Sequence, residues 1–236
     1  TYFIRWNEGF DLSKQTEWWH VIKDGNYDIT DLSSNTRSKI RRGLKHFDVI
    51  PCTRSFIEEN AYEVYFQAFA RYKTFEKRFD KQKFRDAIVG LPSNVEFWGV
   101  FEKKSERIVA FSENVVSANA CFYSTIWFKP ESLKRYAAYA LIHAMNDYYL
   151  NEQKFRYVTD GARNISHSTN IHQFLEQKFL FRKAYSRLRV VYAPLVYLFV
   201  RTMYPCRQFF ARSTTNSVLS KVAVLLEQER IRRACE

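Results

Sequence analysis

The chain has 236 residues, of which 46% are apolar and 17% aromatic, so it can bury a full core as one large domain or as one domain with an extension. Its net charge of +12 predicts an anionic partner such as nucleic acid, a phosphorylated cofactor or a membrane surface, without choosing among them. The absence of a run of about 18 apolar residues argues against a transmembrane helix.

Targeting and redox signals are few. No signal peptide is apparent, and the chain starts at Thr1 without an initiator methionine, which leaves open that an upstream segment is missing. The four cysteines are scattered without metal-ligand spacing, which favours reduced thiols in a cytoplasmic protein over a disulfide framework. No HExxH pattern or His/Cys cluster predicts a metal site.

The first 48 residues are predicted to end in a basic helix over Asn35–Phe47. Ile40, Leu44 and Phe47 form a narrow apolar stripe at helical spacing. Beside this stripe a cationic ridge, defined here as Arg37, Arg41 and Lys45, recurs every four residues with no acid interleaved. The ridge indicates an anion-binding surface, and a merely solvated basic face stays open as the alternative.

The elements expected downstream follow in chain order. They are a strand Val49–Thr53, helices Glu58–Tyr72 and Asp80–Val89, an antiparallel meander of Val95–Phe101, Ile108–Val116 and Asn119–Phe128, a helix Ser132–Leu150, a strand Phe155–Thr159, a helix Thr169–Lys178, and a closing pair of strands Phe179–Ala184 and Leu188–Tyr192. Beyond Pro194 the pattern predicts a helical tail.

The stretch Cys121–Arg163 is the strongest candidate for the working site. A strand that runs directly into a helix presents free backbone N–H groups and a positive dipole end, which together bind anions. Lys129, Lys134 and Arg135 surround the expected start of the helix, with Arg135 in its first turn. A solvated basic loop stays open as the alternative. The strand that follows ends at Asp160-Gly161, and ligands gather at such strand ends in open α/β sheets.

The order of elements from Val49 to Tyr192 resembles the fold of the GNAT superfamily of N-acyltransferases. The resemblance implies a mixed, mostly antiparallel α/β (α+β) sheet flanked by helices. In that superfamily the motif Q/R-x-x-G-x-G/A grips the pyrophosphate of an acyl-CoA such as acetyl-CoA. Arg135 and Ala140 match this motif, whereas Ala138 stands where the family has its central glycine. That glycine lets the backbone approach the phosphates closely.

The basic helix and the segments YVTDGARN and FLEQKFLF resemble the FemAB-like branch of GNAT-like proteins. The helix carries this branch's pattern R-x-x-I-R-R-x-L-K, but Leu180 stands where the branch has a glycine after Lys178-Phe179. Members of this branch take an aminoacyl-tRNA, or sometimes an acyl-CoA, as donor and an amine as acceptor. The resemblance implies an N-terminal segment 1–48, a GNAT-like domain 49–194 and a C-terminal helical extension 195–236.

Acyl transfer to an amine requires a held donor, a base for the amine and an acid for the leaving group. Asp160, at a strand end, is the first candidate for the base, and Glu113, a lone acid in an apolar strand, is the second. Tyr192 is the candidate acid, with Tyr185 near the same closing pair of strands as the alternative. A turn role for Asp160 and a solvent-facing Glu113 stay open. The donor is assigned to Lys129, Lys134, Arg135, Ala138 and Ala140, and to the cationic ridge.

The expected function is therefore an N-acyltransferase that moves an acyl group from acetyl-CoA, or an aminoacyl group from tRNA, to an amine on a cell-envelope or sugar precursor. The alternative is a GNAT-like module without catalysis that binds nucleic acid or another anionic partner. The expected location is the cytoplasm, with the inner membrane surface and a homo-oligomeric state left open.

Overall fold

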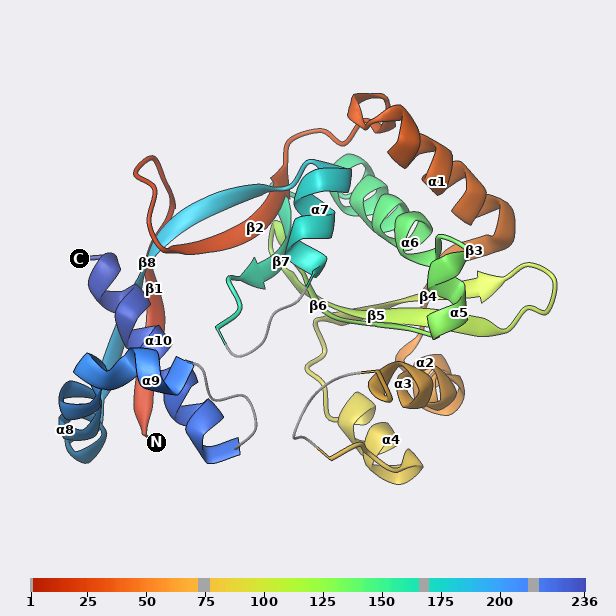
Figure 1. Ribbon diagram of the computed structural model, residues 1–236. Coiled ribbons are helices and arrows are strands. Elements are labelled where there is room, and N and C mark those ends of the chain that lie inside the picture. Colours follow the sequence, from red (N-terminus) through yellow and green to blue (C-terminus); the bar gives the residue numbers. More distant parts are fainter. Residues whose placement is uncertain (1, 72–76, 166–169, 212–216) are drawn as a thin grey trace. The chain divides into compact units, whose positions relative to one another are not determined.

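The computed structural model describes residues 2–71, 77–165, 170–211 and 217–236 (Figure 1). The chain forms two compact units. Unit 1 comprises Thr1–Val21, Ala162–Phe174 and Arg182–Glu236, and unit 2 comprises Ile22–Gly161 and Leu175–Phe181. The three-part division expected from the sequence follows chain order instead, and it stays a prediction.

The described residues contain eight strands. They are β1 (Phe3–Leu12), β2 (Trp18–Asp24), β3 (Phe47–Cys52), β4 (Val95–Glu102), β5 (Ile108–Ser117), β6 (Ala120–Phe128), β7 (Tyr157–Ala162) and β8 (Arg182–Tyr192). Their order in the sheet is β1-β8-β2-β7-β6-β5-β4-β3, and the boundary between the units falls within β2 and β7. The sheet is mostly antiparallel and β6–β7 is a parallel pair, so the predicted fold class is confirmed.

Helices cover both faces of the unit 2 strands. The α-helices of the described residues are α1 (Ser34–His46), α2 (Arg54–Asn60), α3 (Tyr62–Phe69), α4 (Lys81–Val89), α5 (Pro130–Lys134), α6 (Ala137–Asn146), α7 (Ile171–Phe179), α8 (Pro194–Met203), α9 (Arg207–Ala211) and α10 (Ser217–Ala234). In unit 2, α1 and α6 lie on one side of the strands, and α2, α3 and α4 lie on the other (Figure 1).

The predicted basic helix is confirmed as α1. The side chain of Ser33 accepts a hydrogen bond from the Thr36 amide and caps its start. Ile40 and Phe47 are buried as expected, and Leu44 is half-buried. The helix ends where Phe47 adopts extended backbone and begins β3.

The antiparallel meander is confirmed as β4, β5 and β6. On one face of these strands Phe97 and Phe111 pack against Ile57, Tyr65 and Phe84 from the helices α2, α3 and α4. This aromatic cluster fills the core on that side, because ring burial removes a large apolar area from water.

Two predicted helices are each interrupted. The helix expected over Glu58–Tyr72 is α2 followed by α3, and Tyr72 lies outside the described residues. Asn60 donates its side-chain amide to the Phe56 carbonyl at 3.0 Å, which competes with the backbone ladder at the end of α2. The helix expected over Ser132–Leu150 is α5, a break at Arg135-Tyr136, α6 and a π-helical segment Asp147–Glu152.

The closing pair of strands predicted within 179–192 was wrong, because β8 is one strand of Arg182–Tyr192 that pairs with β1. Ala184, Ser186 and Leu188 are all buried, so the period-two alternation continues through the expected turn. The carbonyl of Ser186 accepts a hydrogen bond from the Thr16 hydroxyl at 2.6 Å. Thr169, the expected start of the next helix, lies outside the described residues, and α7 begins at Ile171.

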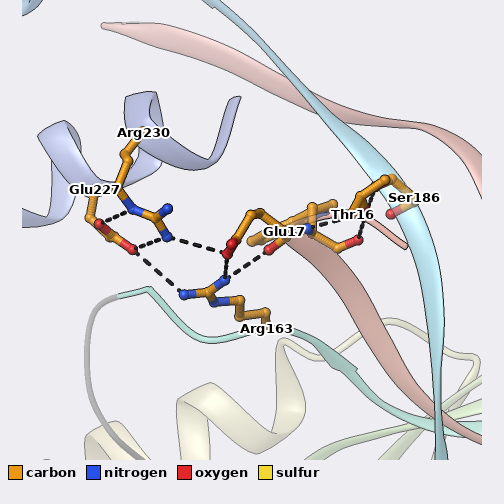
Figure 2. Close-up of polar contacts among 7 residues, drawn as sticks. Thr16, Glu17, Arg163, Ser186, Glu227 and Arg230 are labelled. Carbon is orange, nitrogen blue, oxygen red and sulfur yellow. Dashed lines mark hydrogen bonds and ion pairs between the residues drawn. The ribbon is translucent and has the colours of Figure 1, made fainter. Parts of the chain in front are cut away.

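The helical tail is confirmed, and its last helix, α10, is tied to the other segments of unit 1 by charged side chains (Figure 2). Arg163 donates to the Glu17 carboxylate at 2.6 Å and lies 3.6 Å from that of Glu227. Arg230 donates to Glu17 at 3.3 Å and to Glu227 at 2.9 Å. These side chains are only partly buried, so the ion pairs position α10 while contacts such as Ile231 on Trp18 and Leu188 supply most of its stabilisation.

Within the described segments, no helix is long and apolar enough to cross a membrane. The same segments hold no group of three or more His, Cys, Asp or Glu side chains arranged to bind a metal ion.

Candidate functional site

The two parallel strands of unit 2 separate along their length. β6 and β7 pair only over Ala120–Phe122 and Tyr157–Thr159. Beyond these residues β6 carries a bulge at Ser124 opposite β5, which increases its local twist. The carboxyl ends of both strands thus diverge, and such an opening is where open α/β sheets bind ligands.

The start of α6 follows β6 through the short helix α5. Tyr136 adopts a left-handed backbone with φ of 68°, and its carbonyl accepts from the amides of Tyr139 and Ala140 at 3.1 and 3.2 Å. The amides of Ala137 and Ala138 find no acceptor within the described part of the chain. Ala137 is fully buried and Ala138 is half-buried, so the Ala138 amide is the donor that α6 offers to an anion.

The helix α1 crosses directly over this helix start. A Cβ atom added to Gly43 would lie 2.6 Å from the Tyr136 carbonyl oxygen and 3.1 Å from the Ala140 Cβ. Only glycine allows this approach, so Gly43 sets the distance between α1 and α6. The buried Ala140, a matched motif residue, lies at the crossing, while Ala138 stays half-buried.

Two cations of α1 contact tyrosines of this helix start. Arg42 donates to the Tyr136 hydroxyl at 3.0 Å, and its guanidinium lies 5.4 Å from the centre of that ring. Lys39 lies 5.3 Å from the centre of the Tyr139 ring and 3.4 Å from its hydroxyl. None of these four side chains was a candidate site residue; Lys39 and Arg42 counted only toward the charge of the basic helix, although their i, i+3 spacing was a signal that they share one helix face.

The three residues of the cationic ridge have two different roles. Arg37 donates to the carbonyls of Thr30 and Leu32 at 2.8 and 3.0 Å, so it holds the preceding 3-10 turn. Arg41 and Lys45 are exposed and make no hydrogen bond or ion pair within the described residues. Only these two members remain available to a partner.

Arg135 does not lie in the first turn of the long helix, and that placement was wrong. It follows the end of α5, pairs with the Glu102 carboxylate and lies over the Phe47 ring at 5.1 Å. The hydrogen bond from Arg135 is the main reason that the pKa of Glu102 is lowered. Lys129 precedes α5, and Lys134 is exposed in its last turn. Arg135 thus fixes the joint between α5 and α6 to β4.

The first candidate base, Asp160, lies on β7 beyond the last residue paired with β6. Gly161 follows it with a φ of 86°, a conformation that favours glycine, and any added Cβ would lie 2.9 Å from the Phe122 ring. The backbone of Gly161 therefore passes close to the Phe122 ring of β6, and Asp160 lies just beyond the paired part of the two strands.

The second candidate base, Glu113, faces away from α6. Its neighbours on the same face of β5 are Phe111 and Val115, which pack with the helices α2, α3 and α4. Burial raises the pKa of Glu113 to about 7. The structure thus gives Glu113 a perturbed carboxyl group but does not place it with Asp160 on the α6 side of the sheet.

The candidate acid, Tyr192, belongs to unit 1, whereas both candidate bases belong to unit 2. It is half-buried at the end of β8, and burial raises its pKa to about 12. Within unit 2, the buried Tyr123 of β6 is an alternative phenol. Its hydroxyl donates to the Asn146 side chain at 2.9 Å, and its pKa is raised first by burial and further by nearby acids that include Asp160.

A buried polar network holds the far end of α6 to the sheet. The Tyr149 hydroxyl receives hydrogen bonds from Trp98 and Asn114 at 3.1 and 3.3 Å and donates to Glu96 at 2.8 Å. A cavity of about 410 Å³ lies at this end, lined in part by Glu96, Trp98 and Tyr148. Glu96 is level with Tyr123, at the opposite end of the sheet from the start of α6.

Comparison with known proteins identifies the fold. No family model and no curated protein sequence matches the chain. The structure is similar to that of FemX with a TM-score of 0.59 and 10% identity, over 83% of this chain and 68% of that one. It is also similar to the C-terminal domain (DUF2156) of a putative lysylphosphatidylglycerol synthetase from Agrobacterium fabrum, with a TM-score of 0.52 and 13% identity, over 83% of this chain and 64% of that one.

A third similar structure is a Thermoplasma acidophilum PaiA N-acetyltransferase solved with coenzyme A. The TM-score is 0.36 and the identity 17%, over 45% of this chain and 74% of that one. The chain has a GNAT-like, FemAB-like fold, and the resemblance inferred from the order of its elements is confirmed. At these identities the likeness establishes the fold alone.

Proposed function

We propose that the chain transfers an acyl or aminoacyl group from a phosphate-bearing donor to an amine. The observation that carries this proposal is the divergence of β6 and β7 in a GNAT-like fold, in the same unit as a helix start that offers the Ala138 amide and lies against a basic helix. The opening begins level with Tyr123, near the end of α6, so an elongated donor would extend along α6 from its phosphates at the helix start to its carbonyl in the opening.

The donor is an acetyl-CoA-type thioester or an aminoacyl-tRNA. The amide of the half-buried Ala138 would receive a phosphate, with Lys39 and Arg42, which contact the tyrosines of the same helix start, as additional cations. The exposed Arg41 and Lys45 extend the positive surface along α1, which suits a donor larger than coenzyme A. The resemblance to the FemAB-like branch implies the same two donor classes.

The chemistry requires one bond to form and one to break. The amine nitrogen attacks the donor carbonyl, the C–N bond forms, and the C–S or C–O bond of the donor breaks. Asp160 would accept the proton that the amine loses, since it lies beside the opening. The leaving thiolate or alkoxide then requires a proton, for which Tyr123 is the candidate donor within unit 2. The acceptor is an amine, with a cell-envelope or sugar precursor as the class to test first.

The decisive experiment measures thermal stabilisation of the purified protein by acetyl-CoA, coenzyme A and bulk tRNA, at low and at moderate salt. The double variant K39Q/R42Q should lose most of the shift, because it removes the cations at the start of α6. The matched control R41Q/K45Q removes the same charge from an exposed part of the same helix.

Each result has one meaning. A shift with coenzyme A that survives moderate salt and is lost in K39Q/R42Q supports a CoA-type donor at the α6 start. A shift with tRNA alone that both double variants weaken supports the larger donor, and charged against uncharged tRNA then separates transfer from simple binding. Equal behaviour of K39Q/R42Q and the parent with every donor would refute the assignment of the donor site.

A second candidate function is a binding module without catalysis. It is favoured by the position of Glu113 on the sheet face away from α6 and by the alanine at Ala138. This candidate predicts that Asp160→Asn leaves donor binding unchanged and that no transfer to any amine is detected with the parent protein. Under the proposed transferase, D160N retains donor binding but loses about 100-fold or more in transfer rate.

A further inference from the structure

The helix α8 carries apolar side chains on its inward side and also on its exposed side. Val196, Val200 and Met203 recur at i, i+4 and i+7 and face inward, with Val200 only 2% exposed. Leu195, Leu198 and Phe199 form a second stripe that is 84%, 59% and 40% exposed. We call these three residues the outer stripe of α8.

The outer stripe is unusual for a helix at a protein surface. One apolar stripe normally faces the core while the opposite face is polar. The side chain of Tyr197 is 53% exposed and that of Phe209 of α9 is 80% exposed, and both rings lie near the outer stripe in the sequence. Scattered exposed apolar residues are normal, but a run of four on one ten-residue helix is an interaction surface.

The charge of this part of the chain is strongly positive. From Gln177 to Leu226 the sequence contains no Asp or Glu, but nine Lys or Arg. Some of these cations are paired with acids of β1, such as Arg182 with Asp11 and Arg189 with Glu8. Arg201 and Lys221, by contrast, are exposed and have no acidic partner among the described residues.

We propose that α8 lies in the surface of an anionic lipid bilayer, with its outer stripe among the acyl chains and Arg201 among the head groups. A helix of ten residues is about 15 Å long, too short to cross the hydrocarbon core, so it lies in the plane of the interface. Aliphatic and aromatic side chains beside cations are the composition of interfacial helices. The acid-free stretch supplies the attraction to anionic lipid. Because this inference rests on unit 1 alone, it is independent of the donor site in unit 2.

The test is co-sedimentation of the whole protein with vesicles of phosphatidylcholine containing about 30% phosphatidylglycerol, and with vesicles of phosphatidylcholine alone. The protein should sediment with the anionic vesicles and at least about tenfold less with the neutral ones. Binding should also weaken as salt rises from about 50 mM to about 300 mM, because screening shortens the reach of the cations.

The double variant L195E/L198E should lose anionic vesicle binding by at least about tenfold. Its melting temperature should be unchanged, since the outer stripe does not pack in the core. The control I50E/V89E makes the same chemical change at two exposed apolar side chains of unit 2, and it should bind like the parent. A Phe199→Trp variant gives a second readout, a blue shift of its added emission when anionic vesicles are present.

The proposal is overturned by three results. Equal binding to neutral and anionic vesicles would remove the charge argument. Equal loss in L195E/L198E and I50E/V89E would show that added negative charge alone, rather than the outer stripe, controls binding. A concentration-dependent dimer in sedimentation velocity that L195E/L198E abolishes, without vesicle binding by the parent, would show that a second copy of the chain covers α8.

Discussion

Glu113 provides a quantitative test of the environment that the fold creates. Burial raises its pKa from 4.5 to about 7. A raised carboxyl pKa means that the folded protein favours the protonated form. The contribution of Glu113 to stability is therefore fully present below about pH 4.5 and is lost as the pH rises through about 7. Since one pKa unit corresponds to about 1.4 kcal/mol, the ionised side chain costs the folded state about 3 kcal/mol.

The substitution Glu113→Gln retains the shape of the side chain but cannot ionise. The variant and the parent should have nearly equal free energies of unfolding at about pH 4.5, and the variant should be more stable by about 3 kcal/mol at about pH 8. Urea unfolding followed by circular dichroism at several pH values measures this difference. Other titrating groups, including the half-buried His20 and His143, contribute equally to both proteins and cancel.

The control is Glu59→Gln, which changes an exposed carboxylate of α2 and should leave the pH dependence of stability as it is in the parent. If the stability difference between E113Q and the parent stays constant from about pH 4.5 to about pH 8, burial does not suppress ionisation and the reasoning fails.

Three further substitutions test other parts of the structure by urea unfolding. Gly43→Ala should destabilise the protein although alanine favours a helix by about 1 kcal/mol over glycine, because the new Cβ would displace the Tyr136 carbonyl. A more stable variant would refute the close crossing of α1 and α6. Glu229→Gln should lower the free energy of unfolding by about 1–3 kcal/mol near neutral pH and by less in acid. Burial alone would raise the pKa of this carboxyl, but the hydrogen bonds and charges of Arg232 and Arg233 outweigh burial and lower it. A cost that does not fall in acid would contradict this reasoning. Arg163→Gln should cost only about 1 kcal/mol and lose that cost at high salt, since its ion pairs are partly exposed.

The sequence predicted the fold class because its periodicities are local. The basic helix, the meander and the strand before Gly161 each follow from patterns within about ten residues. The errors occurred where a distant contact decides the backbone. Arg135 lies outside the helix, where its guanidinium forms an ion pair with Glu102 of β4, and that partner lies far from it in the sequence.

The predicted closing strands also failed because a residue pattern within one segment does not reveal a distant partner. Charged residues alternate with buried ones along β8, so the strand continues through residues 185–187, where two separate strands were expected. The partner strand, β1, begins at Phe3 and is therefore almost the whole chain away. Neither the register of that pair nor the separation of β6 from β7 is visible in a single-sequence pattern, because each depends on which strand lies alongside.

The candidate site could be predicted by position but not by its contacts. The approach of backbone to phosphate that the family motif assigns to a glycine is restricted here by Ala138, which carries a Cβ. The close approach that does occur is between helices, at Gly43, and it brings Lys39 and Arg42 onto the tyrosines at the start of α6. Under the proposed function, side-chain charge therefore replaces part of the contribution of backbone amides to holding the donor. Lysine and arginine contacts to phosphate weaken steeply with salt. Donor affinity should accordingly fall more steeply with salt in the parent than in K39Q/R42Q, and equal salt slopes would show that the Ala138 amide holds the donor without these cations.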